Sequence, residues 1–220
     1  MSRSHQEARV SSSPSSSPEL TGGESPVINI AGELVALGPL RRDLLPTYQR
    51  WINDFTTVRN LALPPGPVSM EAETAWYDGA ASGAGDASFT IYERASWRPI
   101  GNTGLHAVDH RNRTAEFGIL IGEADARGRG FGTEATRLML DYAFTALGLH
   151  NLMLRVYAYN HAGLRAYQKA GFRAFGRRRE AVSMGGRLWD VIHMECLASE
   201  FTSPVLGQIF VPDQPRSGAR

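Results

Sequence analysis

The amino-acid sequence predicts an α/β fold of the α+β type, in which a single domain holds a mixed, mostly antiparallel sheet of six to seven strands with helices on both faces. The chain has 220 residues, 42% hydrophobic and 20% charged, which is typical of one globular domain. Runs with strand-like alternation and runs with helical spacing follow one another from residue 34 to residue 196. A strand–helix–strand unit at residues 114–158 requires a parallel pair, because its crossover helix joins strands of the same direction.

The first part of the domain is predicted to contain one strand and two helices. Residues 34–40 alternate as a strand, and residues 43–53 carry apolar side chains at helical spacing. The Pro-rich segment 63–67 then breaks the chain. Ser69 is typical of an N-cap and acidic residues follow it, so we expect a second helix from there through Tyr77.

Three strands joined by short turns follow, which indicates an antiparallel meander. A glycine-rich turn then leads into a helix that we expect to end at Gly148. A further strand, a helix and a closing pair of strands complete the domain. The expected ranges are strands 88–93, 99–109 and 114–122, helix 133–147, strand 152–158, helix 162–170, and strands 172–181 and 187–196.

Composition divides the chain into a domain and two tails. Residues 1–26 are Ser-rich with few large apolar side chains, so we expect a disordered tail, because such a segment buries too little surface to offset its ordering entropy. Residues 27–201 form the predicted domain. Residues 202–220 form a C-terminal tail, whose apolar patch is a candidate for docking on the domain or on a neighbour: Val205, Leu206, Ile209, Phe210 and Val211.

Charge and composition exclude several classes of function. With 23 Lys and Arg against 22 Asp and Glu, the net charge is +1, which argues against nucleic-acid binding through bulk charge. No run of 18 apolar residues predicts a membrane span, and the N-terminal residues lack the apolar core of a secretory signal. We therefore expect a cytoplasmic protein. The single cysteine, Cys196, excludes an internal disulfide and the usual multi-cysteine zinc sites, and we expect no metal.

A glycine-rich loop at a helix start is the most informative motif. Residues 127–133 read Arg-Gly-Arg-Gly-Phe-Gly-Thr and directly precede the helix expected at 133–147. Such a turn leaves several backbone N–H groups without partners, the helix dipole adds positive charge, and Gly130 and Gly132 let an anion approach the backbone. Arg127 and Arg129 add charge. The motif lacks the Gly-Lys-Ser/Thr of a P-loop and the spacing of a dinucleotide fingerprint, and a plain helix-start turn is the alternative.

A second motif lies downstream, at the junction of the strand 152–158 and the helix 162–170. Asn160 stands where that strand ends and the helix begins, so its side chain can cap the helix or bind a ligand. Tyr167 lies seven residues further on, about two helical turns, and therefore on nearly the same face. From spacing alone, a core tyrosine with a satisfied hydroxyl is the favoured interpretation of Tyr167.

Together these motifs resemble the GNAT superfamily of N-acetyltransferases. Arg127-x-x-Gly130-x-Gly132 resembles its acetyl-CoA signature, and the segment from Asn160 through Tyr167 to Gly171-Phe172 resembles its next motif. The run 114–119 is similar to the subgroup of ribosomal-protein N-terminal and spermidine acetyltransferases. The resemblance covers about residues 27–200. One departure is Gly163, where relatives often have alanine.

The resemblance implies a splayed central strand pair with acetyl-CoA in the resulting cleft. The pantetheine arm would pair with the backbone of residues 117–121, and the diphosphate would bind the N–H groups of the loop. Asn160 would bond the arm, and Tyr167 would be the acid that protonates the leaving thiolate. The implied cofactor-binding residues are Phe117, Gly118, Ile119, Leu120, Ile121, Arg127, Gly128, Arg129, Gly130, Phe131, Gly132, Thr133, Asn160 and Tyr167.

Glu116 is the candidate base. An alkyl amine is mostly protonated at neutral pH, so a base must take a proton before it can attack the thioester. Glu116 lies on the strand that would flank the cleft. Two alternatives stay open: an ion pair with Arg113 or Arg155, and binding of the cationic amine.

The acceptor-binding candidates come from the first two helices, which usually shape the acceptor pocket in this family. They are Trp51, Glu71 and Trp76, together with Glu116, although the aromatic residues could equally be core.

We therefore expect an acetyl-CoA-dependent N-acetyltransferase that acts on a small amine, such as a polyamine or aminoglycoside, or on a peptide N-terminus. A CoA-binding regulatory module without catalysis is the main alternative, and an adaptor that uses the Ser-rich tail is a third reading. The resemblance leaves a homodimer open.

Overall fold

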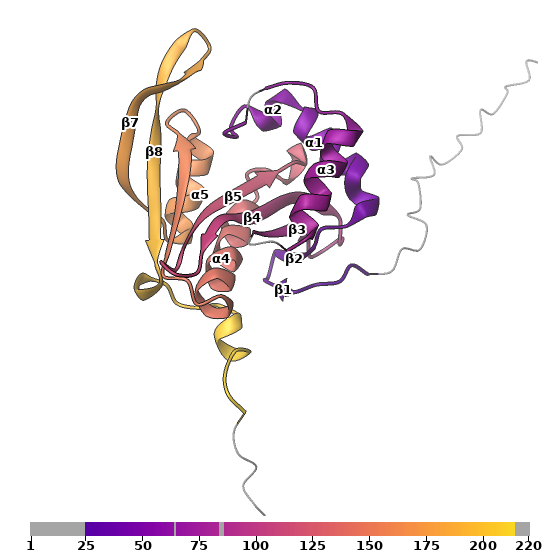
Figure 1. Ribbon diagram of the computed structural model, residues 1–220, viewed down its shortest axis with the longest axis vertical. Coiled ribbons are helices and arrows are strands. Elements are labelled where there is room, and N and C mark those ends of the chain that lie inside the picture. Colours follow the sequence, from indigo (N-terminus) through magenta and orange to yellow (C-terminus); the bar gives the residue numbers. More distant parts are fainter. Residues whose placement is uncertain (1–24, 64, 84–85, 214–220) are drawn as a thin grey trace, which may run out of the picture.

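Eight strands form one sheet in the computed structural model, which describes residues 25–63, 65–83 and 86–213 (Figure 1). The strand order is β1-β2-β3-β4-β5-β6-β8-β7. Every neighbouring pair is antiparallel except β5 and β6. The strands are β1 (Ile30–Ala31), β2 (Val35–Pro39), β3 (Ala87–Glu93), β4 (Pro99–Asp109), β5 (Thr114–Ile121), β6 (Asn151–Tyr157), β7 (Arg173–Met184) and β8 (Arg187–Leu197).

The predicted mixed sheet, its meander and its one parallel pair are confirmed. The sheet has eight strands where six to seven were expected, because the two-residue strand β1 pairs with β2 and is too short to leave a sequence pattern. The expected disorder of residues 1–26 falls almost wholly outside the described residues. In the part of the chain that the structure describes, no helix is long and apolar enough to cross a membrane.

Helices cover both faces of the sheet. Alternation along β3 shows the two faces, because Thr90 bonds the Tyr48 hydroxyl of one helix layer at 2.5 Å while the Phe89 ring packs at 5.1 Å from Tyr142 of the other layer. In Figure 1, α1, α2 and α3 lie together in purple, and α4 and α5 lie across the sheet from them. The helices are α1 (Leu45–Asn53), α2 (Phe55–Val58), α3 (Met70–Ala81), α4 (Phe131–Asp141) and α5 (His161–Ala170).

Local sequence explains most helix boundaries. Ser69 caps α3 as predicted, because its hydroxyl accepts the Ala72 N–H at 3.2 Å. The apolar face of α4 is buried as expected through Met139. The helix was expected to run on to residue 147, but after Asp141 the chain continues as a π-helical turn, Tyr142–Ala146, and this change of period leaves Tyr142 and Ala146 only half-buried.

The C-terminal segment 202–213 belongs in part to the packed domain. Leu206, which the sequence analysis assigned to a tail, is 3% exposed and joins the core. The buried carboxylate of Asp141 accepts the backbone N–H groups of Val205 and Leu206 at 3.0 and 2.8 Å. Of the rest of the apolar patch, Val205 is half-buried, and Ile209, Phe210 and Val211 are exposed. This segment therefore closes over the end of α4.

Candidate functional site

The central strands part after three residue pairs. β5 and β6 pair only from Thr114 with Asn151 to Glu116 with Met153. From Phe117 onward β5 pairs with β4 alone, while β6 continues along β8. The Phe117 ring packs against Tyr167 at 6.2 Å and against Phe172 at 5.9 Å where the strands separate. The splayed pair that the resemblance implied is confirmed, and it frees one edge of residues 117–121.

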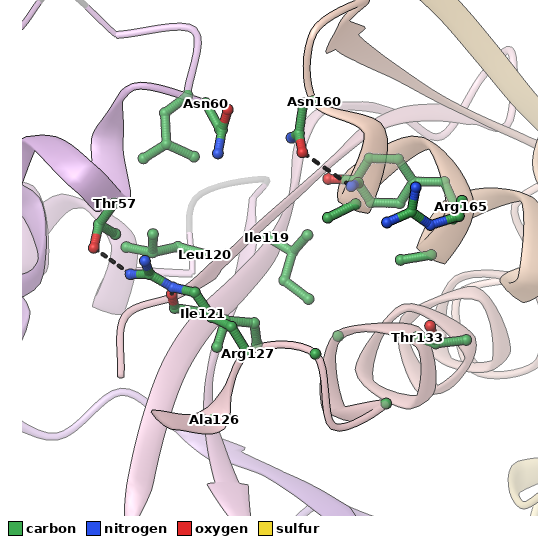
Figure 2. Close-up of a pocket in the computed structure, with 18 of the residues that line it drawn as sticks. Thr57, Asn60, Ile119, Leu120, Ile121, Ala126, Arg127, Thr133, Asn160 and Arg165 are labelled. Carbon is green, nitrogen blue, oxygen red and sulfur yellow. Dashed lines mark hydrogen bonds between the residues drawn. The ribbon is translucent and has the colours of Figure 1, made fainter. Parts of the chain in front are cut away.

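A cavity of about 370 Å³ follows the free edge of β5 (Figure 2). Four segments line it: the end of β5, the loop into α4, the helix α5 and the segment that begins in α2. No described lining residue is a carboxylate, whereas Arg127, Arg165 and Lys169 bring positive charge. The lining residues are Thr56, Thr57, Asn60, Leu61, Ile119, Leu120, Ile121, Ala126, Arg127, Gly128, Gly130, Gly132, Thr133, Asn160, Ala162, Gly163, Arg165, Ala166, Tyr167 and Lys169.

The glycine loop presents bare backbone to this cavity. Gly128 and Gly130 have φ values of +73° and +89°, a conformation that side chains with a Cβ rarely adopt. A Cβ built on Gly128 would meet no atom within 4 Å. Among the described residues, the N–H groups from Arg129 to Gly132 donate no hydrogen bond, and bonding resumes with Thr133 to the Gly130 carbonyl at 3.0 Å. This cradle at the start of α4 fits a diphosphate.

The two arginines of the motif serve the loop more than the cavity. The Arg127 guanidinium donates to the carbonyls of Ile121 and Gly122, each at 3.1 Å, and to the Thr57 hydroxyl. Arg129 points to β3, where it pairs with the buried Glu93 at 2.9 Å, and it does not line the cavity. The positive charge expected from Arg129 is therefore directed away from the cleft.

A carboxylate that the sequence analysis missed holds the first turn of α4. Glu134 accepts three successive N–H groups, those of Glu33, Leu34 and Val35, at 2.9, 2.7 and 2.6 Å. This contact spans about a hundred residues, so no local pattern could reveal it. It fixes the start of α4, and with it the glycine loop, to the turn before β2.

Asn160 caps α5 and lines the cavity. Its Oδ1 accepts the Gly163 N–H at 2.9 Å (Figure 2). A Cβ on Gly163 would lie 2.6 Å from the Asn160 side-chain nitrogen, so the amide occupies the space that an alanine would need. The departure at Gly163 thus allows this position of Asn160. Whether the same amide also bonds a ligand stays a prediction.

Tyr167 lies between the core and the cavity. Its ring packs on Phe117 and Phe172, and its side chain lines the cavity wall. In the described part of the chain its hydroxyl has no hydrogen-bond partner, and burial raises the pKa of the Tyr167 hydroxyl to about 12. The group therefore keeps its proton at neutral pH, as an acid must, and its role stays a prediction.

Glu116 forms an ion pair. Its Oε1 accepts the Arg155 Nε–H at 2.7 Å across the point where β5 and β6 part, with Arg155 48% exposed. One of the two ion pairs foreseen in the sequence analysis is therefore present. The pair does not exclude a role in proton transfer, and the assignment of Glu116 as the base stays a prediction.

The remaining acceptor-binding candidates do not line the cavity. Trp51 is 1% exposed and its indole N–H donates to Glu123 at 2.9 Å, so it is a core residue instead of a pocket wall. Glu71 and Trp76 lie on α3, outside the lining residues, and their role stays a prediction. The free thiol of Cys196 is buried, which raises the pKa of Cys196 to about 11 and disfavours a nucleophilic role.

The wall formed by Thr56, Thr57, Asn60 and Leu61 was missed. Asp54 starts α2 by accepting the Thr56 N–H at 2.9 Å and the hydroxyls of Thr56 and Thr57. An Asp with threonines two and three residues after it is a recognisable cap signal, but a helix of four residues has no periodicity to support it. Arg165 and Lys169 on α5 were also missed as lining residues.

A family model described as an acetyltransferase (GNAT) domain matches residues 35–173, which include all four segments of the cavity wall. Spermidine N(1)-acetyltransferase of Vibrio cholerae serotype O1 is 33% identical over 111 residues, 50% of this chain and 64% of that enzyme, just under two thirds of its length. The Escherichia coli K12 enzyme of the same name is 28% identical over 160 residues, 73% of this chain and 84% of its own.

A solved structure shares the architecture. The crystal structure of spermidine N-acetyltransferase from Vibrio cholerae in complex with CoA and spermine aligns with a TM-score of 0.70 and 26% identity, over 76% of this chain and 97% of that one.

Proposed function

This chain belongs to the GNAT acetyltransferase family, and on that premise we propose that it transfers the acetyl group of acetyl-CoA to the nitrogen of a primary amine. The curated relatives in V. cholerae and E. coli are spermidine N-acetyltransferases, which supports an amine as the acceptor. A polyamine, an aminoglycoside, another small amine and a peptide N-terminus are the acceptor classes to be tested. A cytoplasmic location and a homodimer stay predictions.

The parting of β5 and β6 is the observation that carries this proposal. It frees a strand edge inside a cavity that leads to bare N–H groups at the start of α4. Backbone groups of Ile119–Ile121 could pair with an amide-bearing arm, and the loop from Gly128 to Gly132 could hold a diphosphate. The positively charged lining, without a described carboxylate, supports an anionic occupant.

The chemistry needs few groups because the thioester is already activated. The neutral amine attacks the thioester carbonyl, an N–C bond forms, the C–S bond breaks with the electron pair going to sulfur, and the nitrogen releases one N–H proton to solvent as the amide forms. Tyr167, which lines the cavity from α5, is the proposed donor of a proton to that sulfur, and the raised pKa of its buried hydroxyl supports this role because the group keeps its proton at neutral pH. Holding both reactants in one cleft supplies much of the rate.

The amine must also lose a proton, since an alkyl ammonium with a pKa near 10.4 leaves on the order of one molecule in a thousand neutral at pH 7. Glu116 is the proposed acceptor of that proton, directly or through water. Its place beside the parting point of β5 and β6 supports this role, while its pairing with Arg155 supports a structural one.

Thiol release tests the proposal. The protein would be incubated with acetyl-CoA and, in turn, spermidine, tyramine, kanamycin or a peptide with a free N-terminus, with mass spectrometry of each product. We expect amine-dependent release of free thiol and a product 42 Da heavier. CoA binding by calorimetry without thiol release for any amine would instead identify a binding module.

A further inference from the structure

Two cations in the cavity wall, Arg165 and Lys169, have no anionic partner. Both residues line the cavity from α5, and both are exposed. Among the described residues neither forms an ion pair, and the only side-chain hydrogen bond that involves either of them is one that the Lys169 carbonyl accepts. The third cation of the wall differs, because the Arg127 guanidinium is bound to Thr57 and to two backbone carbonyls.

The two cations stand on one face of α5. They are four residues apart, so they lie one helical turn from each other, with Cβ atoms about 5–6 Å apart. Ala162 and Ala166 from this face also line the cavity, and their short side chains leave the space beside the two cations open. Both charged groups can therefore contact one anion that enters the cavity.

This face of α5 is held beside the start of α4. The Arg137 Nη2 donates to the Lys169 carbonyl at 2.7 Å, and Arg137 lies one helical turn after Thr133, which lines the cavity next to the glycine loop. Figure 2 shows Arg165 on the same side of the opening as Thr133, across from Thr57. The two cations therefore flank the loop whose bare N–H groups fit a diphosphate.

Acetyl-CoA is anionic at two places, the diphosphate and a phosphate monoester on the 3′ oxygen of the adjoining ribose. The N–H groups from Arg129 to Gly132 already offer donors to the diphosphate. The monoester carries about two negative charges at neutral pH, which the charges of Arg165 and Lys169 would balance. One ribose separates the two groups, so a diphosphate on the loop leaves the monoester close to the neighbouring helix.

We propose that Arg165 and Lys169 bind the 3′-phosphate and so make the site selective for CoA thioesters over the same molecules without that phosphate. This inference rests on the proposed function and deepens it. A guanidinium can donate two parallel hydrogen bonds to phosphate oxygens, and an ammonium acts as a mobile point charge beside them. The selectivity comes from α5 and is separate from the backbone cradle that holds the diphosphate.

Calorimetry with CoA and with 3′-dephospho-CoA tests the proposal. The wild type is expected to bind CoA about 10- to 100-fold more tightly, because charge-assisted hydrogen bonds are lost with the phosphate. The double variant Arg165→Gln/Lys169→Gln is expected to lose this preference: its Kd for CoA rises by the same factor, and its Kd for dephospho-CoA stays at the wild-type value. An equal rise for both ligands would assign the two cations to the diphosphate and overturn the proposal.

Arg178→Gln/Arg179→Gln is the matched control. These two arginines lie on β7, are exposed, form no ion pair among the described residues and do not line the cavity. The control removes the same net charge, so it is expected to leave both Kd values unchanged. If it abolishes the preference for CoA as fully as the α5 variant does, the effect belongs to the overall charge of the protein and the assignment to α5 is wrong.

Thiol release separates this inference from the proposed function. Neither residue would touch the reacting atoms, so the α5 double variant is expected to raise the KM for acetyl-CoA and to keep the wild-type kcat at saturating acetyl-CoA. A wild type that prefers CoA through α5 but releases no thiol with any amine would leave the 3′-phosphate site confirmed and the transferase activity refuted. An active transferase that binds CoA and dephospho-CoA equally would refute only the 3′-phosphate site.

Discussion

At the scale of single residues, the cleft chemistry depends on where protons are held. Burial raises the pKa of Tyr167 to about 12, above the usual value near 10, so its proton stays in place through the neutral and mildly alkaline range. The same raised pKa determines how Tyr167 affects the pH dependence of the free energy of unfolding. The contribution of this group is fully present below pH 10 and is lost as the pH rises from 10 to about 12, since the unfolded chain ionises first.

Tyr167→Phe is expected to lower kcat about 100-fold while the Kd for acetyl-CoA changes little, because the substitution removes one proton donor and keeps the ring packing. Thiol-release kinetics and calorimetry measure the two quantities. Tyr142→Phe is the matched control: this tyrosine also has its pKa raised by burial, but it packs on Phe89 and does not line the cleft, so its loss of a hydroxyl should leave kcat unchanged. Equal rates for the wild type and Tyr167→Phe would reject the acid assignment.

The two interpretations of Glu116, as the base or as only an ion-pair partner of Arg155, predict different effects of substituting these two residues. If Glu116 is the base, activity should depend far more on Glu116 than on Arg155. Glu116→Gln is then expected to lower kcat/KM about 100-fold, and Arg155→Gln no more than about threefold. Because Arg155 is 48% exposed, breaking the pair should change the free energy of unfolding by less than about 1 kcal/mol. Steady-state rates and urea unfolding of both variants decide the matter. Small and equal effects of the two changes on turnover would leave Glu116 only its ion pair.

At the scale of elements, the glycine loop unites backbone conformation and ligand binding. Gly130→Val is expected to weaken acetyl-CoA binding at least 10-fold, because a side chain at φ +89° strains the turn and crowds the bare N–H groups. Calorimetry of the folded variant measures the affinity.

The hairpin between β7 and β8 provides a matched control for that strain. Gly185 also has a positive φ, +61°, but lies outside the cleft. Gly185→Val should cost a similar amount of stability, about 1–3 kcal/mol, and leave acetyl-CoA affinity at the wild-type value. Unchanged affinity in a folded Gly130→Val variant would mean that the loop does not bind the diphosphate.

How far sequence predicts these elements depends on the range of the interactions. The Ser69 cap and the meander 88–122 were predicted because local pattern alone determines them. The tie from Glu134 to residues 33–35 and the Thr57 contact of Arg127 join distant segments, and no periodicity encodes them. The destination of a long side chain such as Arg129 is likewise fixed only when its partner, Glu93, is in place. The loop was therefore predictable as backbone, while its supporting side chains were not.

At the scale of the whole molecule, the C-terminal segment contributes to stability. Deleting residues 202–220 is expected to lower the free energy of unfolding by about 3 kcal/mol, because it exposes the pocket of Leu206 and leaves the buried Asp141 without two of its hydrogen bonds. Deleting only residues 214–220 should have no effect of this size. Urea denaturation of both truncations gives the comparison, and equal stabilities would show that the docked segment adds nothing.

The guanidinium of Arg127 joins the two walls of the cleft, since it lies in the loop before α4 and reaches Thr57 in α2. We expect a molecule that orders the loop to order the opposite wall as well. We expect this link to appear as a compulsory order of substrate binding. The acetyl donor binds first, and the acceptor then binds to a site that the donor has already ordered.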